Sequence, residues 1–176
     1  MLRRLARSAV LLYLLLSGCS GARTSATGGV AVSLTREPLN GQAIQHADLS
    51  RTALQAEALI RQGDILAYHL STHEIELRPE AVARLAALKL PMDGLGFVLT
   101  VDGKPVYGGA FWTALSSLSY EGVTILQPLD PGQASVRIAT GYPTGDAPGA
   151  DAPLADDPRA DPRVLDALRR AGVLKE

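Results

Sequence analysis

The fold is decided by residues 97–107, which read Phe97-Val98-Leu99-Thr100-Val101-Asp102-Gly103-Lys104-Pro105-Val106-Tyr107. Two runs rich in β-branched and aromatic residues flank an Asp-Gly pair. A two-residue hairpin of type I′ needs positive φ at both central positions, and Asp-Gly between apolar runs is among the strongest signals for it. The sequence therefore predicts two antiparallel strands joined at Asp102-Gly103.

Upstream of this segment, the sequence predicts a second hairpin and a short helix. Apolar residues alternate over 65–70 and 75–77 on either side of a turn at 71–73, which indicates two paired strands. A helix is expected next, because Pro79 suits the first helical position and Glu80 suits the first turn. The apolar stripe of this helix is Val82, Leu85, Ala86 and Leu88.

The residues before these elements predict one more strand and one more helix. The alternation over 30–34 is typical of a short strand. The stretch 48–61 is expected to be helical, with Asp48 or Ser50 as its N-cap and Gly63 as its end.

Downstream of residue 107, we expect 108–112 to lead the chain out of the hairpin and 113–121 to form a Ser-rich connection. Strands are predicted at 123–126 and 134–139, separated by turn residues. Together these elements predict one α+β domain over residues 30–142, with a small antiparallel sheet and helices on one face.

The C-terminal part of the chain divides into a predicted linker and a predicted helix. Residues 143–160 are dominated by Gly, Ala, Pro and Asp, which bury too little apolar surface to offset the entropy of ordering. A helix is expected within 161–176, with Asp161 as its cap, Pro162 in its first turn and Gly172 at its end. The pattern leaves open whether this helix packs on the domain.

The N-terminus has the pattern of a secretory signal, with three arginines ahead of an apolar run that ends at Leu16. This run is shorter than the roughly 20 residues that a membrane-spanning helix needs. Leu16-Ser17-Gly18-Cys19 resembles the lipobox of bacterial lipoproteins. The resemblance implies a signal peptide at 1–18, a lipid on the Cys19 thiol and, because Ser20 follows, an outer-membrane location facing the periplasm.

Composition agrees with an exported, lipid-anchored domain. Residues 19–29 are small and polar, which is typical of a flexible tether. Cys19 is the only cysteine, so the chain has no internal disulfide and its stability must come from its core. The formal net charge of −1 gives no general attraction for nucleic acid. The membrane, through the anchor, and an envelope protein are the expected partners, and no cofactor is expected.

The central region is similar to the periplasmic head subdomain of the SecD and SecF translocon proteins. The similarity covers roughly residues 64–126 and is carried by Leu77-Arg78-Pro79-Glu80-Ala81-Val82-Ala83-Arg84-Leu85 together with residues 97–107. It implies a small, ferredoxin-like fold. The chain departs from that family in having no predicted transmembrane helix, and in Phe111-Trp112 with the Ser-rich connection that follows.

Two sets of residues raise the question of catalysis. His69 and His73, with Glu74 and Glu76 nearby, have the side chains of a metal site. On an extended strand, however, the two histidines would lie about 13 Å apart, so only a tight turn could let them share an ion. Ser116, Ser117 and Ser119 suggest a nucleophile, with a histidine as base and Asp93 or Asp102 as its orienting group. The Gly-x-Ser-x-Gly elbow of many hydrolases is missing around them, and serines are common in loops.

Aromatic residues gather just after the decisive hairpin and suggest a binding groove. Tyr107, Phe111, Trp112 and Tyr120 are half of the few Phe, Tyr and Trp residues of the chain. They fill the core or, alternatively, line a groove beside Gly108-Gly109 for a peptide, glycan or lipid. Neither this Gly pair nor Gly94-x-Gly96 precedes a predicted helix, so no phosphate-binding loop is expected.

Three functions follow from these patterns. The first is a membrane-anchored envelope lipoprotein with a non-catalytic binding or accessory domain. The second is an envelope hydrolase or metal-dependent enzyme that uses His69 and His73 or the loop of Ser116 to Ser119. The third is a structural spacer.

Overall fold

The computed structural model describes residues 28–130, 132–143 and 157–176. The predicted signal peptide, Cys19 and most of the tether lie outside the described residues. The elements are β1 (Val30–Leu34), α1 (Gly41–Gln45), β2 (Ile60–Arg61), the 3₁₀ turn η1 (Gln62–Asp64), β3 (Ile65–His69), β4 (Glu74–Leu77), α2 (Pro79–Ala86), β5 (Leu95–Val101), β6 (Lys104–Trp112), β7 (Tyr120–Leu126), β8 (Ser135–Tyr142), the 3₁₀ turn η3 (Pro158–Ala160), α3 (Pro162–Arg170) and β9 (Leu174–Lys175).

The strands form a nine-stranded sheet in the order β2-β1-β5-β6-β7-β8-β4-β3-β9. The α+β class is therefore confirmed, but the sheet is larger than predicted. It is also mixed, because β6 pairs with β7 and β3 with β9 in parallel. The expectation of a purely antiparallel sheet is therefore wrong. The sequence pattern could not show this, because side chains alternate along a strand in the same way whether its neighbour is parallel or antiparallel.

The sheet curls until its two ends approach each other. Strand β2 is the first in the strand order and β3 is the last but one, before β9, yet only η1 joins β2 to β3 along the chain. A three-residue connection spans at most roughly 11 Å even when extended. Asp64 of η1 holds this junction, because its carboxylate lies 2.6 Å from Arg84 Nη2 of α2 and its carbonyl accepts from the Arg78 N–H. The sheet is thus a nearly closed barrel around one core.

The decisive hairpin forms as predicted. Asp102 and Gly103 have φ angles of 49° and 76°, as a type I′ turn requires, and Val101 pairs with Lys104 across it. Strand β6 continues to Trp112, so the expectation that 108–112 leads out of the hairpin is wrong. The strand is extended there because its neighbours on both sides, β5 and β7, keep pairing with it.

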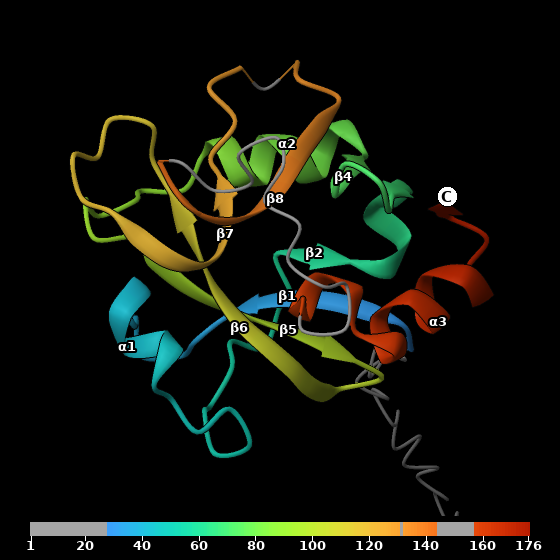
Figure 1. The fold of residues 1–176 in the computed structure, drawn as a ribbon, viewed down its shortest axis with the longest axis horizontal. Helices are drawn as coiled ribbons and strands as arrows, with labels where there is room; N and C mark the ends of the chain where they lie inside the picture. The colour runs from blue at the N-terminus through green and yellow to red at the C-terminus, as the bar shows by residue number, and fades with distance from the viewer. Residues whose placement is uncertain (1–27, 131, 144–156) are drawn as a thin grey trace, which may run out of the picture.

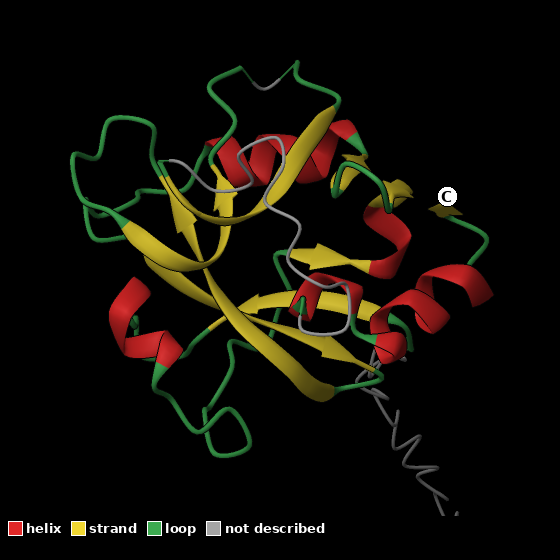
Figure 2. Ribbon diagram, in the orientation of Figure 1, coloured by secondary structure: helices red, strands yellow, loops and turns green. Residues whose placement is uncertain are grey.

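The helices lie on both sides of the sheet (Figure 2), which corrects the prediction of one covered face. Helices α2 and α3 bury Val82, Leu85, Val164 and Leu168 in the same core cluster as the inward side chains of β5. Helix α1 packs on the other face, where a Cβ at Gly108 would come within 3.0 Å of Ile44 Cγ1. Alternate strand residues face opposite ways, and the small residues of β5 and β6 leave room for α1.

The helix predicted over 48–61 does not form. Asp48 accepts from the Ser50 N–H and hydroxyl in a turn, which is the competing use of its side chain. The following residues run beside β1, where the Leu59 N–H donates to the Val32 carbonyl at 2.8 Å. Pairing with the sheet therefore overrides the helical pattern.

The other predicted strands and the helix that begins at Pro79 are present. Strand β1 and the hairpin of β3 and β4 have the expected positions. Helix α2 begins at Pro79 as expected but ends at Ala86, so Leu88 lies beyond it. Strands β7 and β8 are longer than expected, and β8 ends at Tyr142.

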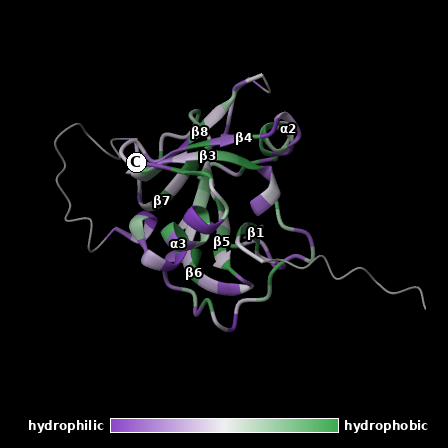
Figure 3. Cartoon of the chain, turned by 90° about the vertical axis from the view of Figure 1, so that its right-hand side faces the viewer, coloured by the Kyte–Doolittle hydropathy of each residue, from purple (hydrophilic) through white to green (hydrophobic). Residues whose placement is uncertain are grey.

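The C-terminal segment packs on the barrel. Helix α3 begins at the predicted cap, Asp161, whose side chain accepts from the Arg163 N–H. Figure 3 shows α3 with hydrophobic and hydrophilic residues, and its apolar side enters the core. Strand β9 then pairs with β3. The predicted linker ends earlier than expected, because η3 belongs to the folded domain, while residues 144–156 lie outside the description. None of the described helices is long and apolar enough to cross a bilayer.

Candidate functional site

The two predicted histidines lie at the β3–β4 hairpin but point to different partners. His69 Nε2 is 2.8 Å from Glu76 Oε1 across the hairpin. His73 adopts a φ of 51° in the turn, and its Nδ1 lies 2.7 Å from the Tyr68 hydroxyl. Within residues 28–130, 132–143 and 157–176, no group of three or more metal-binding side chains is assembled. The structure therefore does not bring His69 and His73 together on one ion.

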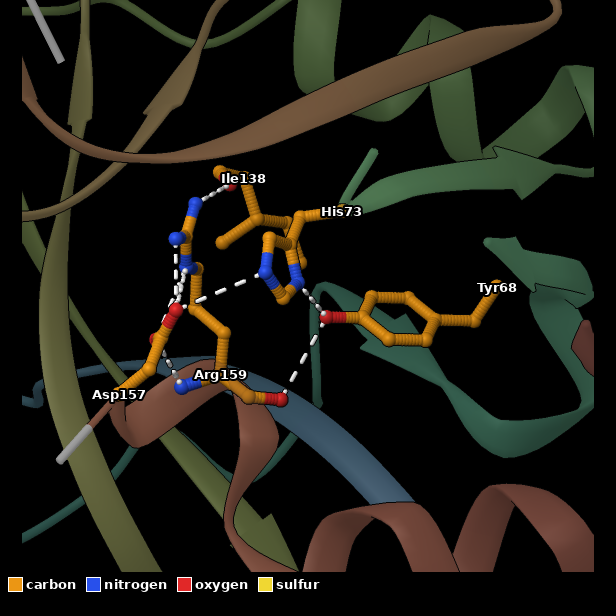
Figure 4. A network of polar contacts seen from close by, with 5 residues as sticks. All are labelled: Tyr68, His73, Ile138, Asp157 and Arg159. Atoms are coloured by element: carbon orange, nitrogen blue, oxygen red, sulfur yellow. Dashed lines mark hydrogen bonds and ion pairs between the residues drawn. The ribbon is translucent and has the colours of Figure 1, made fainter. Parts of the chain in front are cut away.

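His73 belongs to a network of polar side chains that joins the hairpin to the C-terminal segment (Figure 4). Its Nε2 lies 3.5 Å from Asp157 Oδ2. Asp157 in turn binds Arg159, whose Nη2 is 2.6 Å from the same carboxylate oxygen. Arg159 Nη1 donates to the Ile138 carbonyl at 2.8 Å. The network thus links β3, β8 and η3, which are far apart in sequence.

The charged side chains of this network are buried. The side chains of Asp157 and Arg159 are only 8% and 7% exposed. Burial alone would raise the pKa of Asp157, but the hydrogen bonds and positive charge of Arg159 outweigh it and hold that pKa below its ordinary value. Tyr107 lies within reach of the same charges, and burial, with Tyr68 second, raises its pKa far above the usual range. At neutral pH, Asp157 is therefore negatively charged and Tyr107 keeps its proton.

The arrangement of hydroxyl, imidazole and carboxylate resembles a nucleophile with its base, but it is closed to substrate. The Tyr68 side chain is 3% exposed, and its hydroxyl lies 3.4 Å from the Arg159 carbonyl. A catalytic group must reach a reacting atom of the substrate. We conclude that this network, the His73–Asp157–Arg159 latch, fastens the C-terminal segment to the barrel. Sequence reasoning missed Asp157 and Arg159, because both stand at the end of a low-complexity stretch.

The serine loop holds itself together through its own hydroxyl. The Ser116 Oγ donates to the Met92 carbonyl at 2.6 Å and accepts from the Leu118 N–H at 3.1 Å. Its proton is therefore given to a backbone oxygen and not to a histidine. Of the two proposed orienting groups, Asp93 accepts from Asn40 and Asp102 accepts from the Gly29 N–H. Among the described residues, therefore, the Ser116 hydroxyl is bonded neither to a histidine nor to one of these two carboxylates.

The four predicted groove aromatics divide between the two faces of the sheet. Tyr107 and Phe111 enter the main core, where Phe111 packs on Phe97 with ring centroids 5.0 Å apart. Trp112 and Tyr120 form a second cluster on the opposite face, with Tyr142 at its edge. Alternation along β6 explains the division, since neighbouring residues of a strand point to opposite faces. A single groove lined by all four residues does not exist.

Trp112 and Tyr120 are among the residues that line a surface hollow. Their rings stack with centroids 5.0 Å apart and an interplanar angle of 14°. The hollow encloses about 480 Å³ and opens towards solvent. It is lined by Asn40, Gln42, Gln45, Asp93, Trp112, Leu118, Ser119, Tyr120 and Glu121. This volume lies within the range of small-ligand sites, which is about 300–1,000 Å³.

Two buried polar atoms of these aromatic residues have no hydrogen-bond partner among the described residues. Trp112 and Tyr120 are 2% and 6% exposed, and neither Trp112 Nε1 nor the Tyr120 hydroxyl has a hydrogen-bond partner among the described residues. Burial raises the pKa of Tyr120 to about 12, so the hydroxyl keeps its proton at neutral pH. Buried polar atoms are nearly always paired, and each exception asks for an explanation.

An exposed apolar loop adjoins the hollow. Leu115 and Leu118, both in the segment between β6 and β7, are 78% and 48% exposed, and Met92 beside Ser116 is 54% exposed. Leu118 also lines the hollow. Residues 113–119 and Met92 are named the leucine loop below. Sequence reasoning noted only the serines of this loop, although two leucines among serines were a visible signal of an exposed apolar contact.

No protein-family model, no curated protein and no solved structure matches this chain. The function must therefore be argued from the residues and the geometry alone.

Proposed function

We propose that this chain is an envelope lipoprotein, held to the membrane through Cys19, whose barrel is a non-catalytic binding module. The binding surface is the leucine loop together with the hollow over Trp112 and Tyr120. The observation that supports this proposal is the position of this surface at the end of the barrel remote from the tether.

Strand β6 shows which end of the barrel lies beside the tether and which end lies far from it. The chain enters the barrel beside the Asp102-Gly103 turn, where the Gly29 N–H donates to Asp102 at 2.6 Å. From there β6 runs nine residues to Trp112, which corresponds to roughly 26 Å of extended strand. Figure 1 shows β6 crossing from that turn, at the lower right, towards the upper left, where the leucine loop follows. A domain tethered before Gly29 thus presents this loop away from its anchor.

The apolar side chains of the leucine loop favour a binding role over a spacer. Large exposed apolar residues that lie together on a surface mark interaction sites more often than residues scattered singly. A spacer has no use for them, and they would promote aggregation. An enzymatic role has less support, because the side chains of Ser116, His69 and His73 contact structural partners.

The lipid anchor, the outer-membrane location facing the periplasm and the likeness to SecD and SecF heads stay predictions. The lipobox supports the first, and attachment of two or three acyl chains would give stable anchoring. The prediction of a ferredoxin-like fold rests on the likeness to SecD and SecF alone. Fold by itself would not decide the function.

Photocrosslinking in intact cell envelopes tests the proposed binding surface. A photoreactive amino acid replaces Leu118 in the full-length chain, and the matched control replaces Leu66, which is 46% exposed on β3, away from the hollow. We expect a discrete crosslinked species from position 118 that position 66 does not give. Equal products from both positions, or none from position 118, would overturn the proposal.

A further inference from the structure

We propose that the leucine loop and the adjacent hollow bind a basic amphipathic segment of a partner protein, with its apolar side chains on the loop and its Lys or Arg side chains in the hollow. This inference rests on the proposed function, because it names the kind of partner taken at the same surface. It is carried by exposed apolar residues and exposed carboxylates that lie together without a counter-charge.

Apolar and acidic side chains neighbour each other on the two segments that form this surface. Met92 is followed directly by Asp93, and Leu118 stands shortly before Glu121. The Ser116 Oγ donates to the Met92 carbonyl at 2.6 Å, so the two segments lie side by side. Asp93, Leu118 and Glu121 line the same hollow, and all three are exposed to solvent. A partner arriving from solution can therefore contact all three residues.

The two carboxylates of the hollow have no cationic partner among the described residues. Asp93 accepts a hydrogen bond from the neutral amide of Asn40 at 2.8 Å, and neither Asp93 nor Glu121 forms an ion pair in that part of the chain. No residue that lines the hollow is Lys, Arg or His, and residues 113–119 contain none of these. Lys89, the nearest cation to Asp93 along the chain, does not line the hollow. The negative charge of this surface is therefore uncompensated.

The other end of the barrel shows that this lack of cations is local. Beside the turn between β5 and β6, three carboxylates each form an ion pair with an arginine of α3. The pairs are Asp102–Arg170, Asp161–Arg163 and Asp166–Arg169, with closest distances of 3.6, 2.7 and 2.7 Å. Negative charge is thus balanced within the chain beside the tether, and it is left for a partner at the remote end.

Charge and apolar surface together select the partner. A surface of one sign attracts molecules of opposite charge and repels those of like charge, so phosphates, nucleic acid and anionic headgroups are disfavoured here. An Arg guanidinium can pair with a carboxylate and donate its remaining N–H groups to the amide oxygens of Gln42 or Gln45 in the lining. The exposed side chains of Met92, Leu115 and Leu118 can bury apolar residues of the same segment. A segment that offers both kinds of side chain is amphipathic and basic.

Peptide binding to the full-length lipidated chain, in nanodiscs of a zwitterionic lipid, tests this inference. Three fluorescein-labelled octapeptides alternate leucine with arginine, with glutamate or with serine, and empty nanodiscs give the background of binding to lipid. We expect the arginine peptide to bind at least fivefold more tightly than either of the others, with an affinity that falls as salt is added. Equal affinities of the three peptides, or no binding of the arginine peptide above background, would overturn the inference.

A pair of double variants assigns the binding to the two carboxylates. Asp93→Asn with Glu121→Gln removes both charges and keeps an acceptor for Asn40, so we expect the affinity of the arginine peptide to fall by about fivefold, the effect of losing two exposed ion pairs. Asp166→Asn with Glu176→Gln makes the same charge change in the C-terminal segment and should leave the affinity unchanged. Urea midpoints of both double variants verify folding. Equal affinities of the two double variants would contradict the assignment.

The outcomes separate this inference from the proposed function. A crosslink specific to position 118, without a preference for the arginine peptide, refutes the basic partner and leaves the binding surface in place. A preference for the arginine peptide, without that crosslink, supports the basic partner and refutes the proposed contact of Leu118 in the envelope. A crosslinked species of twice the mass of the chain would assign the surface to a second copy and overturn this inference. Failure of both experiments removes both proposals.

Discussion

Asp157→Asn is the substitution that should expose how the C-terminal segment is held. The Asp157 carboxylate contacts Arg159 at 2.6 Å and His73 at 3.5 Å, and both side chains of the Asp157–Arg159 pair are over nine-tenths buried. The amide of Asn is nearly isosteric but uncharged. It removes the negative charge that faces the buried Arg159 guanidinium, while the hydrogen bond to Ile138 remains.

The expected loss of stability is large for a single substitution. Removing one partner of a buried ion pair typically costs about 3–5 kcal/mol, because the attraction between the two buried charges is lost. Asn retains one acceptor for Arg159, so we expect about 3 kcal/mol. With a urea slope of about 1–3 kcal/mol per M, a loss of about 3 kcal/mol should lower the unfolding midpoint by roughly 1–3 M.

Urea unfolding followed by the fluorescence of Trp112 measures this loss. Trp112 lies on the opposite face of the sheet from the latch, so its signal reports the whole barrel. Asp161→Asn is the matched control, because Asn caps a helix as well as Asp does and the ion pair with Arg163 is more exposed. The control should lose less than about 1 kcal/mol. A loss below 1 kcal/mol for Asp157→Asn would refute the latch.

Three further results are expected. Gly109→Ala should destabilise the barrel by about 2 kcal/mol in urea unfolding, since its Cβ would lie 2.5 Å from both Phe97 Cζ and the Val123 carbonyl, whereas Gly63→Ala has open space and should be neutral. Because the pKa of Asp157 is depressed, its stabilising charge is fully present above about pH 4 and is lost as pH falls through the lower folded value. The stability difference between wild type and Asp157→Asn should therefore shrink in acid, and a constant difference down to pH 2.5 would contradict this. Labelled palmitate should enter the wild-type chain in cells and fail to enter Cys19→Ser, and equal labelling would exclude the anchor.

The elements that sequence reasoning predicted well are those set by local chemistry. Asp102-Gly103 forms the expected turn because both residues tolerate positive φ, whatever surrounds them. Pro79 begins α2 because its ring presets the helical φ and its missing N–H would have had no partner there. Such signals act over a few residues, and they survive in the fold unchanged.

The features that sequence reasoning missed depend on contacts between distant residues. The segment 48–61 has a helical pattern, but hydrogen bonds to β1 hold it beside the sheet. The role of Asp157 and Arg159 becomes visible only in the folded structure, where the C-terminal segment lies against His73. The division of Phe111 from Trp112, in contrast, was within reach, because extending β6 by five residues puts them on opposite faces.

The central claim is that the leucine loop and the hollow face away from the membrane. Energy transfer from Trp112 to dansyl-labelled headgroups, in vesicles that hold the lipidated full-length chain, tests it most directly. The comparison is a variant that combines Trp112→Phe with Lys104→Trp and so moves the only tryptophan to the other end of β6, beside the tether. We expect weak transfer from Trp112 and strong transfer from position 104. Equal transfer, or stronger transfer from Trp112, would contradict the proposed orientation.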